Sequence, residues 1–404
     1  MEQILSLPSK RTLYVRVILT TLTTLTVFKA NGFPLAGDFG AFYVVAKRVW
    51  LGDLDLAYQI EAFVKLQVEV LGARHSASWT YPPQFDMLLA PLALMPGWAA
   101  NLLFTAGTLA FYLMTLRAIA GNNFAPVLVI LFPAIALNIL TGQNGLLTGA
   151  LIGLVCINAK KRQLSGQMLA GLALGAMIIK PHLAIAAGVY LLATRRWAAI
   201  ATAAIVVLAS SLVCTLVFGP QIWITWLGAI REAASFLERG MYPLYRMISG
   251  YAALYTAGAS ATGAFWGQTI MAGLALLAVV LAVVRRASPS FALGISAMVS
   301  VMISPYAYDY DLPIVGIGLA LLLPDLTRLA SAGERSIIYG LVMLTGTYGL
   351  LSTFLAPLQI GARGGLAMIA LLVLLLRILL RKQPTLASSS EPAEILPHPA
   401  RVLE

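Results

Sequence analysis

An isolated carboxylate, Asp38, lies a few residues after the end of the first hydrophobic segment. A carboxylate is costly to keep near hydrocarbon, so this position needs a physical reason. One interpretation is a helix N-cap, because Asp38 precedes an amphipathic run and aspartate caps helices well. The other is a general base that faces the extracytoplasmic side of a membrane and takes a proton from a hydroxyl group. The local sequence leaves both interpretations open.

Lys180 interrupts an apolar stretch and is followed by Pro181 and His182. A cation inside an apolar segment usually has a function in a bilayer, and a compact ammonium is a good point-charge partner for a phosphate. The alternative is a lysine that extends from a helix end to the membrane interface. His182 either supports a ligand at Lys180 or is a solvated or capping histidine.

Two Asp-x-Asp pairs, Asp53/Asp55 and Asp309/Asp311, are candidates for holding a divalent metal, since hard cations prefer carboxylate oxygens. Neither pair follows a strand of an α/β sheet, as it does in soluble nucleotide-sugar enzymes, so we expect no metal. Three tyrosines surround the second pair and are either interfacial anchors or groups that stack on and hydrogen-bond a sugar: Tyr306, Tyr308 and Tyr310. The chain has no phosphate-binding glycine loop, zinc-ligand spacing or nucleophile elbow, which disfavours an ATPase, a metalloprotease and an esterase.

The composition indicates that a membrane bundle positions these residues. Of the 404 residues, 60% are hydrophobic and 11% are charged, whereas a soluble domain has about 25% charged residues. The net charge of +11 indicates basic cytoplasmic loops and contact with anionic membrane lipids, and no nucleic-acid partner is expected. Cys156 and Cys214 lie in apolar segments, which favours buried thiols over a disulfide or a metal site.

The hydrophobic segments predict the helices of this bundle. They cover residues 12–29, 84–95, 98–118, 125–139, 144–158, 166–179, 182–194, 198–218, 264–284, 290–304, 310–323, 336–354 and 364–380. Several are shorter than the ~20 residues needed to cross a bilayer. Either 84–95 or 125–139 is expected to be re-entrant, because the basic loops require an odd number of crossings between Asp38 and Lys160. The predicted fold is a single all-α integral membrane domain over residues 1–382, with about 12 transmembrane helices and both termini inside.

Two loops and a tail complete the predicted chain. The first loop, 31–83, contains amphipathic stretches near 39–51 and 57–72, which lie along the membrane surface or pack on the bundle. The second loop spans 219–263, and residues 383–404 are predicted to be a disordered cytoplasmic tail. Basic residues at 160–162, at 195–196, at 285–286, at 328 and 335, and at 381–382 mark alternate turns as cytoplasmic. Both loops, Lys180 and the stretch 304–311 then lie on the extracytoplasmic side, and Asp38 lies there within the first loop.

Five motifs follow one another along this chain: Asp38-Phe39-x-x-x-Tyr43, Tyr81-Pro82-Pro83, Gly142-Gln143-Asn144, Lys180-Pro181 and Ser304-Pro305…Tyr310-Asp311. Together they resemble glycosyltransferase family 87, whose members are membrane enzymes of the GT-C type. The family includes mannosyltransferases of mycobacterial phosphatidylinositol-mannoside synthesis. The resemblance covers roughly residues 12–325.

The resemblance implies an inverting transfer of a hexose, mannose in particular, from a polyprenyl-phosphate carrier to a lipid or glycan acceptor. It places the reaction at the extracytoplasmic face of a bacterial plasma membrane and requires no metal or other cofactor. Asp38 matches the catalytic base of such enzymes, and Lys180 matches a lysine suited to the donor phosphate. The remaining residues expected to bind substrate are Tyr43, Tyr81, Gln143, Asn144, His182, Tyr308, Asp309 and Asp311.

The main alternative is a secondary transporter or flippase for a lipid-linked or polar solute, since about 12 crossings with polar breaks also suit a transporter. However, the sequence shows no two-half repeat, and its carboxylates gather at one face instead of near the midplane. A structural or assembly protein would explain neither Asp38 nor Lys180. We therefore expect an enzyme.

Overall fold

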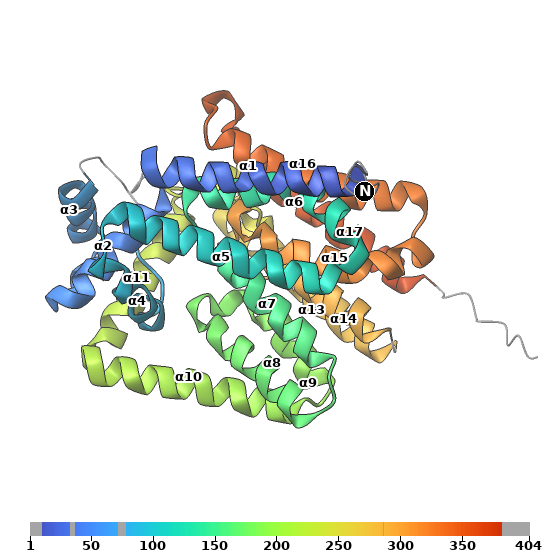
Figure 1. Ribbon diagram of the computed structural model, residues 1–404, viewed down its shortest axis with the longest axis horizontal. Coiled ribbons are helices and arrows are strands. Elements are labelled where there is room, and N and C mark those ends of the chain that lie inside the picture. Colours follow the sequence, from blue (N-terminus) through green and yellow to red (C-terminus); the bar gives the residue numbers. More distant parts are fainter. Residues whose placement is uncertain (1–9, 33–36, 72–77, 286, 382–404) are drawn as a thin grey trace, which may run out of the picture.

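The computed structural model describes residues 10–32, 37–71, 78–285 and 287–381, and the regular elements of this part are all helices. The longer helices form a bundle that runs roughly along the long axis of the molecule (Figure 1). They are α1 (Lys10–Gly32), α5 (Gly97–Ala120), α6 (Phe124–Thr141), α7 (Gly145–Ala159), α8 (Leu164–Ala176), α9 (Ile185–Ala193), α10 (Trp197–Phe218), α13 (Ala261–Val284), α14 (Pro289–Val299), α15 (Leu312–Leu329), α16 (Ala332–Ser352) and α17 (Arg363–Leu380).

Length and composition identify the helices that can cross a membrane. Five helical stretches of the described chain are long and apolar enough: Gly97–Thr141, Trp197–Phe218, Ala261–Val284, Asp309–Leu329 and Arg363–Leu380. Shorter apolar helices span Tyr14–Phe28, Gly145–Ala159, Leu164–Ile179 and Pro289–Met302. The predicted all-α membrane bundle is therefore confirmed, and the number of 12 crossings stays a prediction.

Helix α15 forms the centre of the bundle. Every residue from Leu312 to Leu323 is buried, and the helix packs against α5, α6, α7, α14 and α16. A helix that is apolar on all sides needs such surroundings. Gly318 of α15 faces Gly294 of α14 so closely that a Cβ at Gly318 would lie 2.8 Å from the Gly294 carbonyl oxygen. By contrast, only 6% of the apolar window of α10 is buried in the protein, so α10 faces outward.

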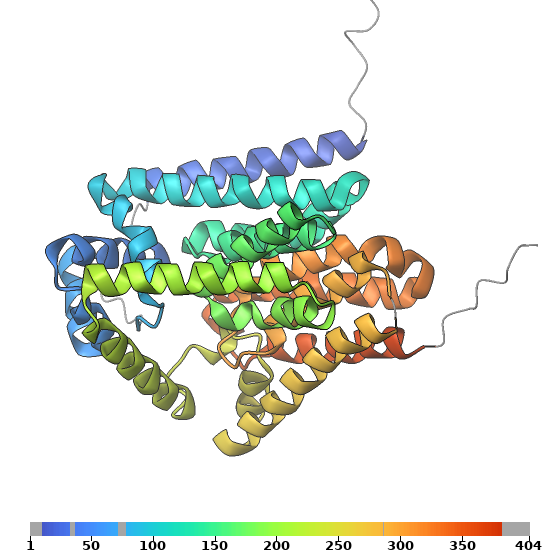
Figure 2. The same ribbon diagram turned by 90° about the horizontal axis from the view of Figure 1, so that it is seen from below.

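A group of short elements, here called the cap, lies at one end of the bundle (left in Figures 1 and 2). It comprises α2 (Asp38–Leu51), η1 (Leu54–Tyr58), α3 (Ile60–Leu71), α4 (Pro83–Leu89), η2 (Ala90–Leu94) and α11 (Gln221–Glu238). The predicted stretches 39–51 and 57–72 correspond to α2 and α3. Residues Phe39–Ala46 of α2 are all buried, so α2 packs on its neighbours, which is one of the two arrangements that the sequence left open.

The structure gives the helix lengths of the two re-entrant candidates, and which of them is re-entrant stays a prediction. The predicted segment 84–95 consists of α4 and η2, with seven and five residues, and is too short for a bilayer that needs about 20. The other re-entrant candidate, 125–139, lies inside the 18-residue helix α6. The loop 219–263 contains α11, η6 (Leu244–Arg246) and α12 (Gly250–Thr256), which were not predicted. The predicted tail, 383–404, lies outside the described residues.

Candidate functional site

The site lies where the cap meets the bundle. It combines the start of α2, residues 78–83, the turn between α6 and α7, the turn at Lys180, and residues 304–311. Glycine or proline lies at each of these places, since glycine allows left-handed backbone and proline disfavours helical backbone at the residue before it: Gly37, Pro82, Gly142, Pro181 and Pro305. The remaining short elements near these turns are η4 (Met177–Ile179), η5 (Pro181–Leu183), η7 (Ser300–Met302) and η8 (Asp309–Asp311).

Lys180 forms a buried ion pair with Asp311. Its Nζ lies 2.8 Å from Asp311 Oδ1, and the two side chains are 7% and 1% exposed. The other carboxylate oxygen, Oδ2, accepts the backbone N–H of Tyr308 at 3.1 Å. Burial alone would lower the pKa of Lys180, but the Asp311 carboxylate raises it above its ordinary value. Lys180 therefore keeps its proton, and the anion that offsets its charge is Asp311.

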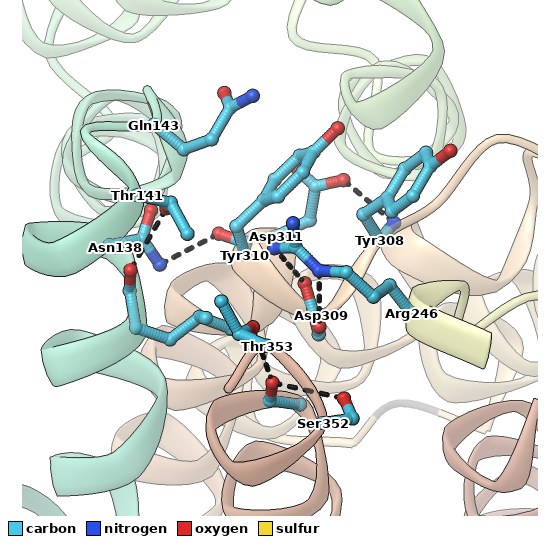
Figure 3. Close-up of polar contacts among 12 residues, drawn as sticks. Asn138, Thr141, Gln143, Arg246, Tyr308, Asp309, Tyr310, Asp311, Ser352 and Thr353 are labelled. Carbon is cyan, nitrogen blue, oxygen red and sulfur yellow. Dashed lines mark hydrogen bonds and ion pairs between the residues drawn. The ribbon is translucent and has the colours of Figure 1, made fainter. Parts of the chain in front are cut away.

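Arg246 forms a second, bidentate pair with Asp309 (Figure 3). Arg246 Nε lies 3.1 Å from Oδ2 and Nη2 lies 3.0 Å from Oδ1, with the side chains 13% and 2% exposed. Burial alone would lower the pKa of the Arg246 guanidinium, but Asp309 raises it, and Asp38 contributes in the same direction. Ile248 N–H donates to the Ala307 carbonyl at 2.9 Å, which holds the Arg246 segment against residues 304–311.

The ring of Tyr310 lies between the two pairs. Lys180 Nζ is 4.5 Å from the ring centroid, and Arg246 Cζ is 5.7 Å from it. Tyr308 stacks on the same ring at 5.0 Å with an interplanar angle of 10°. Because cations are attracted to aromatic faces, Tyr310 helps to hold both ion pairs in place.

Asp38 differs from these carboxylates because it pairs with no residue that the structure describes. It is half-buried, and within the described residues it makes no hydrogen bond or ion pair. The N-cap of α2 is Gly37, without a side-chain capping bond, so the interpretation of Asp38 as the N-cap is wrong. Gly37 has a φ of 73°, and a Cβ there would lie 2.6 Å from the Thr141 carbonyl oxygen. This glycine therefore presses the start of α2 against the end of α6 and fixes the backbone beside Asp38.

The turn between α6 and α7 adds a group of amides. Asn138 Nδ2 donates to the Tyr310 carbonyl at 3.0 Å, and Gln143 Oε1 accepts the Asn144 backbone N–H at 3.2 Å. The Tyr81 hydroxyl lies 3.4 Å from the same Gln143 oxygen. Asn144 is completely buried, and neither atom of its amide makes a well-aligned hydrogen bond with a described residue, although the Tyr81 hydroxyl lies close enough to interact with it. An unsatisfied buried amide is unfavourable, so Asn144 is suited to a ligand hydroxyl that reaches it.

Gly145 sets the distance between this turn and the ion pairs. A Cβ at Gly145 would lie 1.7 Å from the Tyr310 carbonyl oxygen, so Gly145→Ala must displace residues 309–311. We expect a loss of roughly 1–3 kcal/mol of stability and a fall in activity. Gly188→Ala, in helix α9 with no atom within 4 Å of the added Cβ, is the matched control and should not destabilise. Thermal unfolding of both detergent-solubilised variants checks this, and equal melting temperatures would contradict it.

The other predicted site residues lie around this centre. Burial lowers the pKa of His182 to about 4, with Asp311 opposing and Lys180 adding to the effect, so His182 is neutral at pH 7. The Tyr43 hydroxyl donates to the Met95 carbonyl at 3.0 Å, and this hydrogen bond joins α2 to the end of η2. The structure therefore does not point the Tyr43 hydroxyl at the ion pairs.

Two residues of the site were not predicted individually, Arg246 and Asn138. The sequence could have identified Arg246 as a site residue, because an arginine in a loop predicted to be extracytoplasmic departs from the positive-inside tendency. It gave no such signal for Asn138, since the role of Asn138 depends on the fold that brings Tyr310 beside it.

In the described chain no group of three or more His, Cys, Asp or Glu side chains could hold a metal. Asp309 and Asp311 each hold a basic side chain instead, and the expected metal independence stays a prediction.

Comparison with known families adds one finding. The model of glycosyltransferase family 87 matches residues 79–305, which is more than half of the chain. The matched region contains Tyr81, Gln143, Asn144, Lys180 and Arg246, whereas Asp38 precedes it and Asp309 and Asp311 follow it. Searches of curated proteins and of solved structures gave no match.

Proposed function

The chain belongs to glycosyltransferase family 87, and from this premise we propose that it moves a hexosyl residue, mannosyl in particular, from a polyprenyl-phosphate-linked donor to a lipid or glycan acceptor. Its helices make it a multi-pass membrane protein. Membership in a glycosyltransferase family favours an enzyme over the transporter that the sequence left as an alternative.

The observation that carries the proposal is that Asp38 pairs with no described residue and lies beside two satisfied ion pairs. A general base must be ionised and free to accept a proton. Asp309 and Asp311 already hold Arg246 and Lys180, whereas Asp38 has no partner among the described residues. We assign Asp38 as the base that deprotonates the acceptor hydroxyl. Attack by that hydroxyl in a single displacement inverts the anomeric centre.

The two paired cations support a phosphate leaving group. Lys180 has three N–H donors and Arg246 has five, and their contacts with Asp311 and Asp309 use only some of these. The remaining donors are suited to the charge that develops on a departing polyprenyl phosphate. Gln143, Asn144 and the other polar residues of the site are then assigned to the sugar hydroxyls: Tyr81, His182 and Tyr308.

Charge distribution supports an extracytoplasmic site. The cytoplasmic turns predicted from basic residues follow α7, α9, α13, α15 and α17, and these helices end on the side of the bundle away from the cap (Figure 1). The positive-inside tendency puts that side in the cytoplasm. We propose that the site faces the outer side of a bacterial plasma membrane, where lipid-linked sugars are used without nucleotides.

The proposal is tested by offering two donors separately to protein in liposomes that contain the acceptor. Polyprenyl-phosphate-linked sugar should give product without added nucleotide, and EDTA should leave the rate unchanged because no metal is required. Nucleotide-sugar alone should give no product. Liposomes that carry the Asp38→Asn protein are the control for uncatalysed transfer.

Product from nucleotide-sugar in the absence of a lipid carrier would overturn the donor assignment. Together with inhibition by EDTA, it would return Asp309 and Asp311 to a metal-binding role, for which Arg246 and Lys180 would have to move away.

A further inference from the structure

A second acidic residue of the cap, Asp86 of α4, is completely buried. Trp79 Nε1 donates to Asp86 Oδ1 at 2.9 Å, and the Tyr58 hydroxyl oxygen lies 2.5 Å from Asp86 Oδ2. No basic side chain among the described residues forms an ion pair with it. A buried carboxylate without a cation is strongly unfavourable, and a group in this position commonly remains protonated.

The hydrogen bonds around Tyr58 show whether Asp86 is ionised or protonated. The same Tyr58 hydroxyl oxygen lies 3.0 Å from the Tyr81 carbonyl oxygen. A tyrosine hydroxyl has one proton, so it cannot donate to an ionised Asp86 and to Tyr81 at once. If Asp86 Oδ2 carries a proton, it donates to Tyr58, Tyr58 donates to Tyr81, and Trp79 donates to Oδ1. Every contact then has one proton.

We propose that Asp86 is a neutral carboxylic acid that positions Tyr81 in the site through the hydroxyl of Tyr58. Tyr81 is held on one side by the ring of Phe85, at 4.6 Å between centroids, and reaches the site through its hydroxyl near Gln143. Its ring also lies 5.8 Å from Lys180 Nζ. The consequence for catalysis rests on the proposed function, whereas the protonation of Asp86 does not.

The surroundings of Asp86 support the neutral form. Burial raises the pKa of Asp86 to about 8, although the hydrogen bonds from Tyr58 and Trp79 oppose this shift. The titratable groups that face it are Tyr58 of η1 and Cys214 of α10. Helix α4 also packs on α2 and α11, and no ion pair joins Asp86 to their charged residues, all of which are described: Asp38, Lys47, Arg48, Arg231, Glu232 and Glu238.

The first test measures protonation without any transfer assay. A folded pKa of about 8 lies above the ordinary value of 3.8, so the folded state binds the extra proton between these pH values. The stability contributed by Asp86 therefore falls as the pH rises from about 4 to about 8. Asp86→Asn keeps an acceptor for Trp79 and a donor for Tyr58, so it should fold and lack this pH dependence. Infrared spectra should show a protonated carboxyl band that disappears near pH 8 in the wild type and is absent from the variant.

The second test measures the role in the site. Asp86→Asn should retain transfer at pH 7 and stay active at pH 9, where the wild type should fall about tenfold as Asp86 ionises. Tyr58→Phe, which breaks the chain of hydrogen bonds, should lower activity at both pH values while the protein still folds.

Misfolding of Asp86→Asn, or melting temperatures that change with pH in parallel for the variant and the wild type, would overturn the neutral carboxyl. A confirmed carboxyl band with no effect of Tyr58→Phe on transfer would overturn the positioning role alone. If no variant or wild type transfers sugar at all, the infrared and unfolding results still stand, and only the proposed function fails.

Discussion

Asp38→Asn lowers the turnover of the purified enzyme by roughly 10²-fold or more, because it removes the oxygen that accepts the proton of the acceptor hydroxyl. The variant keeps the size of the side chain, and the wild-type carboxylate makes no described hydrogen bond or ion pair that its loss would break. Folding should therefore be unchanged. Turnover is measured with lipid-linked donor in liposomes, and folding by thermal unfolding in detergent.

Asp55→Asn is the matched control, because Asp55 is an exposed carboxylate of the same cap. It should retain wild-type turnover. Near-full turnover of Asp38→Asn under the same conditions would show that Asp38 is not the base. The contrast with Asp86→Asn is equally informative, because the same chemical change at two carboxylates of the cap should strongly lower activity at one and preserve it at the other.

Lys180→Ala has the largest expected effect on stability. It leaves the Asp311 carboxylate, 1% exposed, without its cation, and breaking a buried pair in this way costs about 3–5 kcal/mol. The pair Arg328–Asp325 has the same 2.8 Å separation but lies at the surface, with the arginine 64% and the aspartate 14% exposed. Arg328→Ala should therefore cost about 1 kcal/mol or less. Thermal unfolding of both variants measures the difference.

A paired variant separates the structural role of Lys180 from its proposed role with phosphate. Lys180→Met combined with Asp311→Asn removes both charges and should recover most of the lost stability. It should still transfer poorly, because no ammonium is left to stabilise the departing phosphate. Wild-type transfer by the folded double variant would show that Lys180 only balances the charge of Asp311.

The sequence alone determined the class of the protein, because hydrophobic runs and basic turns are local properties of the chain. It also predicted Asp38, Lys180, Asp309 and Asp311 as site residues, since the type of each residue and its place near an apolar segment can be read directly, but not the ion pairs that three of them form. It could not choose between segments 84–95 and 125–139 as the re-entrant one, and that choice stays a prediction. Hydropathy gives the apolar length of a segment but not how far its helix extends: the helix that contains 125–139 has 18 residues.

Only the tertiary structure decided which charges neutralise one another. Lys180 and Asp311 are 131 residues apart, and Arg246 and Asp309 are 63 apart, so no local pattern connects them. Their meeting depends on close backbone contacts, such as Gly145 against the Tyr310 carbonyl. Within the described chain the same packing leaves Asp38 without a partner and encloses Asp86 without a cation. Three carboxylate environments (paired, free and neutral) thus arise from one residue type, because the environment of a carboxylate is set by what the fold places around it.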